Sequence, residues 1–196
     1  GSIDSTGKIT EIGNGDPVSD FADIEEELNM WYQKILEVNR DKLQKILKTN
    51  NDSITALTEL YQGVGVKKFH VKDALKATNL EDKDLESFSI QDSKKFSTYL
   101  RKISKPTLIV ANKIDVPNAD KNFHRLRERY NDMIIVPASA DSELTLRRAE
   151  QKGLIKYSPG SEQFEILKDD DLNDKQKNAL DFIKKDIMGE YMRTGV

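Results

Sequence analysis

The chain has 196 residues, 33% of them charged, a formal net charge of −3 and no cysteine. The length fits one ordinary domain or two small ones, and the charge balance gives no global field directed at nucleic acid. The lack of cysteine excludes a disulfide framework, a thiolate zinc site and a cysteine nucleophile, and two distant histidines do not make a histidine-rich metal site. No apolar run approaches the roughly 18 residues of a membrane span, and the N-terminus has no signal-peptide pattern, so we expect a cytoplasmic protein without a membrane partner.

Residues 1–19 are expected to form a loop, because glycine and proline recur there among polar residues. Residues 20–104 carry apolar residues every three or four positions, which predicts a helical hairpin or small bundle. The first apolar stripe continues to about residue 48, as one long helix or a kinked pair, and its near-heptad part comprises Phe21, Ile24, Leu28, Trp31, Ile35 and Val38. A stop and a new N-cap follow at 50–53, and further helices are predicted over 66–77 and 90–104. The aromatic residues of this region, Trp31 included, are expected to pack in its core.

The period of the pattern changes after Pro106. Residues 107–111 form a short apolar run typical of a strand buried on both faces, and 133–136 form a second such strand, stopped by Pro137. Helices are predicted over 122–130 and 142–152, followed by a connector over 160–171. A last helix is opened by a capping box of Asn173 and Gln176. The alternation of strands and helices predicts parallel strands of an α/β sheet.

A polar tetrapeptide, Asn112-Lys113-Ile114-Asp115, directly follows the first of these strands, where open α/β sheets bind ligands. The residue types match guanine. The Asp115 carboxylate can accept both the ring N–H and the exocyclic amino group, whereas adenine offers no such pair of donors. Asn112 can face the other edge of the base and brace a neighbouring loop, and Lys113 can lay its methylene stem on the base face. The alternative is a loop in which the Asn and Asp cap the next helix.

The second strand ends in a run of small residues, Pro137-Ala138-Ser139-Ala140. A small residue such as Ala140 lets a backbone N–H approach the guanine carbonyl oxygen, and Ser139 can hold the turn and support Asp115. The helix between the two strands allows both ends to converge on one pocket. The two segments together predict a guanine nucleotide, GTP or GDP, as the ligand.

Phosphoryl transfer would also need a phosphate-binding loop, a lysine and a magnesium ligand. The nearest approach is 1-GSIDSTGKIT-10, in which Gly1 is one residue too early, Ile9 replaces the magnesium-binding hydroxyl and no apolar strand precedes the loop. The pattern D-x-x-G occurs at 4–7, in a loop, and at 186–189, inside a predicted helix. We expect none of these segments to bind phosphate, so no catalytic or metal-binding residue can be named.

The chain resembles the translation-associated GTPases of the Obg-related YchF family, in their archaeal form. The resemblance rests on 105-KPTLIVANKID-115, 137-PASADSELTLRRAEQKGLIKYSPG-160, 190-EYMRTGV-196 and 23-DIEEELNMWYQKIL-36. It implies an α/β fold in which residues 105–196 are the C-terminal half of a Ras-like P-loop G domain and residues 20–104 are an all-α, coiled-coil-like insertion. The chain would then begin just after the third nucleotide motif and stop where a TGS domain would start.

The resemblance also implies that the intact parent hydrolyses GTP with Mg²⁺ and contacts a ribosome or translation factor. The best-studied bacterial and eukaryotic members replace the N-K-x-D motif and favour ATP, whereas this sequence keeps Asn112, Lys113 and Asp115, so we expect guanine. The chain alone is expected to be inactive. Its strands should expose an edge and an apolar face, so that it is stable mainly through its helices or self-associates.

An alternative function is a helical protein- or ribosome-interaction module without nucleotide activity. The N-K-I-D segment would then be a relic or a helix cap. Three lysines at helical spacing, Lys42, Lys45 and Lys48, would be available to rRNA phosphates, although such a stripe is more often a solvated face. A third possibility is a split enzyme whose other half is a separate chain.

Overall fold

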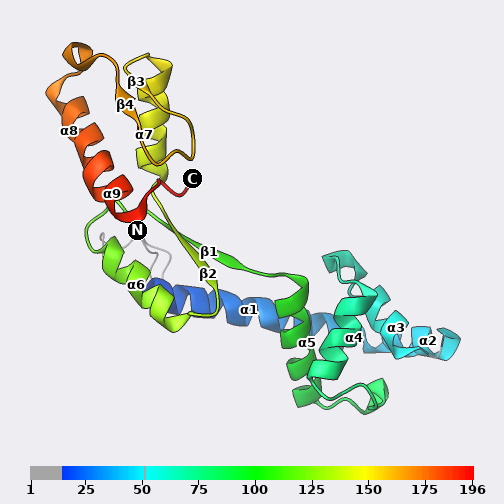
Figure 1. Ribbon diagram of the computed structural model, residues 1–196. Coiled ribbons are helices and arrows are strands. Elements are labelled where there is room, and N and C mark those ends of the chain that lie inside the picture. The colour runs from blue at the N-terminus through cyan, green and yellow to red at the C-terminus, as the bar shows by residue number, and fades with distance from the viewer. Residues whose placement is uncertain (1–14, 51) are drawn as a thin grey trace. The chain divides into compact units, whose positions relative to one another are not determined.

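The computed structural model describes residues 15–50 and 52–196 (Figure 1). It divides into a helical unit, residues 19–107, and an α/β unit, residues 108–196 with the chain up to Val18. The segments 1–10 and 4–7, considered above for phosphate binding, lie outside the described residues, as does most of the expected N-terminal loop. Helix α1 begins at Pro17, so residues 17–19 are helical and not part of a loop. Proline suits a first helical position because its fixed φ and missing N–H cost nothing there.

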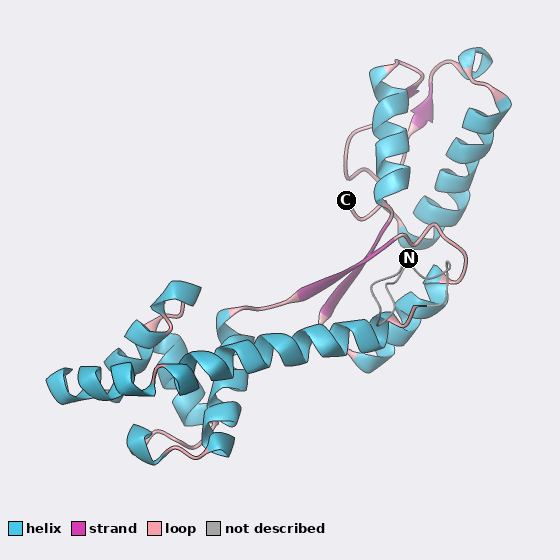
Figure 2. Cartoon of the chain, turned by 180° about the vertical axis from the view of Figure 1, so that it is seen from behind, coloured by secondary structure: helices cyan, strands magenta, loops and turns pink. Residues whose placement is uncertain are grey.

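The helical unit is built from helices, the first of which is 22 residues long (Figures 1 and 2). Capping residues fix the start of several of them. The first stripe forms a kinked pair that breaks at Asn39, and the side chain of Asp52 caps the next helix by accepting from the backbone N–H groups of Ile54 and Thr55. The last helix of the unit opens with a capping box between Ser89 and Asp92. The helices are α1 (Pro17–Val38), α2 (Arg40–Asn50), α3 (Ser53–Leu60), α4 (Lys68–Ala77) and α5 (Ile90–Ser104), with 3-10 turns at Gln62–Val64 and Leu85–Ser87.

One continuous apolar core fills the helical unit, with residues from all five helices. Its centre is aromatic: the rings of Tyr32 and Tyr61 stack with centroids 5.7 Å apart, and Phe96 meets Tyr61 edge to face at 6.4 Å. The buried Tyr61 hydroxyl donates to the carbonyl oxygen of Tyr32 at 2.8 Å, so its polar end is satisfied. The predicted small bundle is therefore a closed and well-packed unit.

Helix α1 buries a different face from the one predicted. Trp31 is 50% exposed, and Ile24 and Val38 are exposed as well, so the prediction that Trp31 packs in the core is wrong. The buried side chains of α1 are Tyr32 and Leu36. The same face carries Glu25 and Asn29, both of which bind the buried Arg101 of α5 (Glu25–Arg101; Asn29 Oδ1 to Arg101 Nε, 3.2 Å). Partly buried polar residues thus share the inward face of α1 with Tyr32 and Leu36, so apolar periodicity alone did not identify this face.

The α/β unit follows the predicted order of strand, helix, strand and helix. Strands β1 (Leu108–Asn112) and β2 (Ile134–Ala138) are parallel, with Leu108 opposite Ile134 and Asn112 opposite Ala138, and α6 (Ala119–Arg129) connects them. Pro137 does not stop β2 but lies inside it, opposite Ala111. A proline is tolerated there because β2 has β1 as its single neighbour in this described sheet, which leaves the outer N–H side without a partner strand.

The second half of the unit contains elements that the sequence did not reveal. An antiparallel pair, β3 (Ile155–Lys156) and β4 (Glu165–Ile166), lies partly in the stretch expected to be a plain connector. The predicted capping box of Asn173 and Gln176 is confirmed at the start of the last helix. The elements are α7 (Ala140–Gln151), β3, β4, a 3-10 turn (Asp169–Asp171), α8 (Asp174–Phe182), a π turn (Ile183–Ile187) and α9 (Met188–Tyr191).

The apolar residues of this unit form two separate small cores. One lies between α7, the β3–β4 pair and α8, and the other joins Ile114, Phe123 and Ile187, with Ala111 and Ile135 of the strands packed against it. The π turn links them: the N–H of Met188 donates to the carbonyl of Ile183, five residues back. As a result Ile183 and Met188 belong to the first core and Ile187 to the second.

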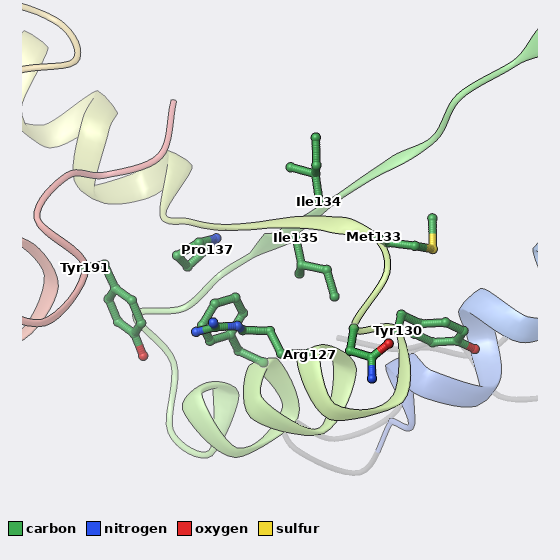
Figure 3. Close-up of a pocket in the computed structure, with 9 residues that line it drawn as sticks. Arg127, Tyr130, Met133, Ile134, Ile135, Pro137 and Tyr191 are labelled. Atoms are coloured by element: carbon green, nitrogen blue, oxygen red, sulfur yellow. The ribbon is translucent and has the colours of Figure 1, made fainter.

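The two faces of the strand pair differ in burial. Ile135 points toward α6, while Ile134 points to the opposite side (Figure 3). On that opposite side Leu108 is 56%, Val110 53% and Ile134 69% exposed. The strands are therefore not buried on both faces, and the expected exposure of an apolar face is confirmed. On the α6 side, a pocket of about 560 Å³ opens between α6, β2 and Tyr191.

Candidate functional site

The five residues predicted to read a base meet at the carboxyl ends of β1 and β2. Asn112 is the last residue of β1 and is paired with Ala138, the last residue of β2. The N–H of Ile114 donates to the Ala138 carbonyl at 3.1 Å, which carries the pairing one step past the strand and buries the Ile114 side chain. The N-K-I-D turn and the start of α7 are thereby held side by side.

Ser139 fixes the carboxylate of Asp115. Its hydroxyl donates to Asp115 Oδ1 at 2.6 Å, a short distance typical of a hydrogen bond to a charged acceptor. The same hydroxyl oxygen accepts from the backbone N–H of Ser142 at 3.2 Å and so caps α7, and the Ser142 hydroxyl lies 2.7 Å away. Ser139 is fully buried, whereas Asp115 is half-buried. One edge of the carboxylate is therefore held, and its remaining lone pairs stay accessible to a ligand.

Asn112 ties the two loops together. Its Oδ1 accepts the backbone N–H of Lys113 at 2.8 Å and that of Ala140 at 3.2 Å. Among the residues that the structure describes, its amide nitrogen has no protein partner, so two donors remain for a ligand. The Ala140 N–H, predicted to meet the guanine carbonyl oxygen, instead donates to Asn112. The bond is long, and the N–H belongs to Ala140, the exposed first residue of α7, so a base oxygen would share or replace it.

Lys113 has an unusual backbone conformation, with φ at +67°. Residues other than glycine are disfavoured in this left-handed region by about 1–2 kcal/mol, because the Cβ atom approaches the backbone. Such strain is found most often at functional turns. Here it reverses the chain after β1, so that the N–H of Val116 donates to the Lys113 carbonyl at 3.1 Å. The side chain of Lys113 is exposed at the mouth of the site.

A second group of residues, which the sequence did not single out, lies beneath the Ser139 turn. The buried carboxylate of Glu143 accepts three side-chain hydrogen bonds: from the Tyr157 hydroxyl at 2.6 Å, from the Thr194 hydroxyl at 2.7 Å and from Arg147 Nε at 2.6 Å. Thr194 also accepts, through its carbonyl oxygen, the backbone N–H of Ser139 at 2.7 Å. These residues lie in the segments 137–160 and 190–196, but no local pattern connects the two segments.

The environment of Glu143 keeps its carboxylate ionised. Burial by itself raises the pKa, but the hydrogen bonds from Tyr157, Thr194 and Arg147 outweigh it, so the pKa lies below its ordinary value. Burial and the bond to Glu143 raise the pKa of Tyr157. At neutral pH the pair is therefore a neutral phenol that donates to a charged carboxylate.

Other features that could indicate a function were sought in the described residues. No cluster of three or more His, Cys, Asp or Glu side chains that could hold a metal ion is found in residues 15–50 and 52–196. The D-x-x-G pattern at 186–189 lies within the π turn and α9, as predicted. The pocket of Figure 3 is lined by none of the five residues predicted to read a base. Over the same described ranges, no helix combines the length and apolarity needed to cross a bilayer.

The unit has a parallel strand pair with flanking helices. The carboxyl ends of the strands bring an N-K-x-D turn next to a Ser-Ala turn. This is the architecture of the C-terminal half of a Ras-like G domain. Residues 110–196 match the family model described as "Obg-like GTPase YGR210-like, G4 motif-containing domain". The predicted fold class is thus confirmed. The family match over residues 110–196 supports the resemblance at the level of an Obg-like GTPase domain that carries the G4 motif.

Similar proteins carry related names. The chain is 36% identical over its whole length to "Uncharacterized GTP-binding protein MJ1332" of Methanocaldococcus jannaschii, of which it covers 48%. It is 31% identical, over 86% of its length, to "Uncharacterized GTP-binding protein C428.15" of Schizosaccharomyces pombe, of which it covers 41%. A crystal structure of a GTP-binding protein from Pyrococcus horikoshii superposes with a TM-score of 0.74 at 31% identity, covering 98% of this chain and 50% of that one. The chain thus spans half, or less, of the length of these relatives.

Proposed function

We propose that this chain is the base-recognition part of a guanine-nucleotide-binding protein, and that Asn112, Lys113, Asp115, Ser139 and Ala140 read the guanine. The observation that carries the proposal is the 2.6 Å bond from Ser139 to Asp115, which holds the carboxylate at the end of β1 with its free lone pairs accessible. A helix-capping role alone does not account for this contact, because α6 begins after Asn118, which makes no side-chain capping bond, and not at Asp115.

Base reading would use preorganised groups. Asp115 accepts the ring N–H and the exocyclic amino group of guanine, and Ser139 keeps the carboxylate from rotating away. The Ala140 N–H, at the exposed start of α7, donates to the guanine carbonyl oxygen, while the two donors of Asn112 face the opposite edge of the base. The exposed Lys113 stem covers the base face. Adenine leaves the carboxylate without its pair of donors, and an unpaired buried polar group is costly.

The wider role is part of the same proposal. The relatives named GTP-binding proteins support guanine nucleotide as the ligand, and they are about twice as long as this chain. We infer that the phosphate-binding loop and the Mg²⁺ ligands lie in a part of the parent outside this chain, and that this chain alone does not hydrolyse GTP. The parent would be a cytoplasmic, YchF-like GTPase.

The helical unit is proposed to contact a ribosome or translation factor. Two features support this: Lys42, Lys45 and Lys48 are all exposed on α2, and several large apolar side chains of the unit are exposed, among them Ile24, Trp31, Phe69 and Ile90.

The test is a nuclear magnetic resonance titration of the ¹⁵N-labelled chain with GDP, and with ADP as the control. Because phosphates normally provide most of the affinity, we expect a dissociation constant near or above about 1 mM, or about −4 kcal/mol. GDP should shift the backbone signals of Lys113 and Ala140, and ADP should not. Equal shifts with both nucleotides, or shifts elsewhere, would contradict base recognition at this site.

The variant Asp115→Asn sharpens the test. An asparagine amide accepts the ring N–H but donates where guanine also donates, so it matches xanthine, which has a carbonyl in place of the amino group. We expect GDP binding to fall at least about tenfold and xanthosine diphosphate binding to rise. Asp120→Asn makes the same chemical change on an exposed carboxylate in the first turn of α6 and serves as the matched control.

A further inference from the structure

The C-terminal segment of the chain runs directly under the base site. We call residues Arg193–Gly195 the strap. Its central residue, Thr194, is 1% exposed, and its carbonyl oxygen accepts the backbone N–H of Ser139 at 2.7 Å. Ser139 is the residue whose hydroxyl holds Asp115. The strap therefore fixes the backbone of the residue that orients the base-reading carboxylate.

The strap is anchored by a polar bond inside the unit. The Thr194 hydroxyl donates to Glu143 Oε2 at 2.7 Å, and Glu143 lies one helical turn beyond Ser139 in α7. The N–H of Glu143 in turn donates to the Ser139 carbonyl at 3.1 Å. Thr194 thus holds the Ser139 turn twice, directly through its carbonyl and indirectly through Glu143. The other donor to Glu143 Oε2 is Tyr157, at 2.6 Å, which does not belong to the strap.

The strap also requires a glycine. Gly195 has φ at +76°, and a Cβ at this position would lie 2.0 Å from the carbonyl oxygen of Pro137 and 2.9 Å from the Cα of Ala138. Both of these atoms belong to the backbone of β2, just before the Ser139 turn. Any side chain would therefore push the strap away from the strand, in addition to its conformational strain.

We propose that the strap is a positioning element of the guanine site, in which Thr194 and Gly195 set the place of the Ser139–Ala140 turn and thereby the specificity for guanine. The inference rests on the proposed function, because it concerns how the same site is held. Neither residue touches the base. Their effect is transmitted through the Ser139 backbone to Asp115 on one side and to the Ala140 N–H on the other.

The experiment is the same GDP and ADP titration, carried out on variants of the full chain. Thr194→Val removes the anchoring hydroxyl with little change of shape, and we expect GDP to bind about tenfold more weakly, the effect of losing one hydrogen bond to a charged group. Thr194→Ser keeps the hydroxyl and should restore binding. Gly195→Ala should weaken GDP binding at least as much as Thr194→Val. ADP should cause no shift of the Lys113 and Ala140 signals in any of them.

Two controls separate positioning from a general loss of stability. Tyr157→Phe removes the other hydroxyl from the same Glu143 oxygen but leaves the strap in place, so GDP binding should stay within about twofold of the unchanged chain. Arg193→Ala removes an exposed ion pair with Glu162 from the strap itself and should also have no effect.

The outcomes are distinct. If Tyr157→Phe and Thr194→Val weaken GDP equally, the strap is merely structural and the inference is wrong. If the unchanged chain binds GDP selectively but Thr194→Val and Gly195→Ala bind it equally well, the inference fails while the proposed function stands. If the unchanged chain does not distinguish GDP from ADP, both fail.

Discussion

The helical unit and the α/β unit are stabilised in different ways. The helical unit has one continuous core with an aromatic centre, whereas the α/β unit divides its apolar residues between two small cores and leaves one face of its strands exposed. The candidate base site lies in the second unit. There, the positions of the site residues depend less on apolar packing than on hydrogen bonds among Asp115, Ser139, Glu143 and Thr194. A bonded network of this kind defines geometry where a core is too small to do so.

Each unit also contains a carboxylate that is bonded to side chains of its own unit: Glu25, which is partly buried, and Glu143, which is fully buried. The two are satisfied differently. Glu25 pairs with the buried guanidinium of Arg101, and its second oxygen has no hydrogen-bond partner in the described residues. Glu143 is surrounded by two hydroxyls and one half-exposed arginine. The first arrangement depends on a single cation, and the second distributes its stabilisation over several donors. The two should therefore respond differently to the loss of one partner.

The largest effect is expected for Arg101→Ala. It leaves the partly buried Glu25 carboxylate without its Arg101 counter-charge and takes a donor from Asn29 and from Thr107, so the free energy of unfolding of the helical unit should fall by about 3 kcal/mol, the lower end for a buried ion pair. Denaturant unfolding followed by fluorescence measures this, because the single tryptophan, Trp31, lies in the helical unit.

The control for this variant is Lys83→Ala, which removes an ion pair between the exposed Lys83 and Asp92 within the same unit and should cost much less. A decrease of the free energy of unfolding by less than about 1 kcal/mol in Arg101→Ala would show that Glu25 does not depend on this one cation. The proposed difference between Glu25 and Glu143 would then be wrong.

An intermediate, pH-dependent effect is expected for Glu143. Its folded pKa lies below the ordinary value of 4.5, so its contribution to stability is present above pH 4.5 and is lost as the pH falls through the folded pKa. Glu143→Gln should cost about 1–3 kcal/mol at neutral pH, because the amide NH₂ cannot accept from a hydroxyl or from Arg147. The variant should also make the stability of the α/β unit less dependent on pH in the acid range.

Resonances of α7 amide groups report on this unit, and a denaturant series at several pH values measures the dependence. If the free energy of unfolding falls as steeply with acid pH in Glu143→Gln as in the unchanged chain, other carboxylates cause the pH dependence.

The smallest effect on stability is expected for Leu108→Glu. The side chain lies on the exposed face of β1, so the free energy of unfolding should change by no more than about 0.5 kcal/mol. The exposed apolar face should instead cause association of the unchanged chain. The charge of the introduced glutamate should shift the equilibrium toward monomer, as measured by sedimentation velocity. Ile135→Glu, which points toward α6, should destabilise the unit. A monomeric unchanged chain at the same concentration would argue against association through this face.

Features with a local signal were predictable from the sequence. Helix α5 spans the predicted residues Ile90–Ser104, because a capping box opens it and an apolar stripe runs through it. The N-K-I-D turn was found because a motif and a topological rule coincide at the end of β1. The β3–β4 pair was missed because two-residue strands show no alternation.

Long-range contacts decided the remaining differences. The face of α1 was assigned wrongly because Arg101, far along the chain, binds Glu25 and Asn29 on the inward face of the helix. The strap was missed for the same reason: Thr194 and Ser139 lie far apart in the sequence, and neither residue predicts the other.

The π turn at Ile183–Ile187 fixes the number of residues that this part of the chain can have. Each residue of an α-helix turns the following residues by about 100°, so removing one residue from this turn would rotate Ile187, Tyr191 and everything after them. Ile187 and Tyr191 would leave the core beneath the strands, and Thr194 would no longer reach Ser139. We therefore expect the segment from Ile183 to Gly195 to tolerate substitutions at its exposed positions other than Gly195, but neither insertions nor deletions.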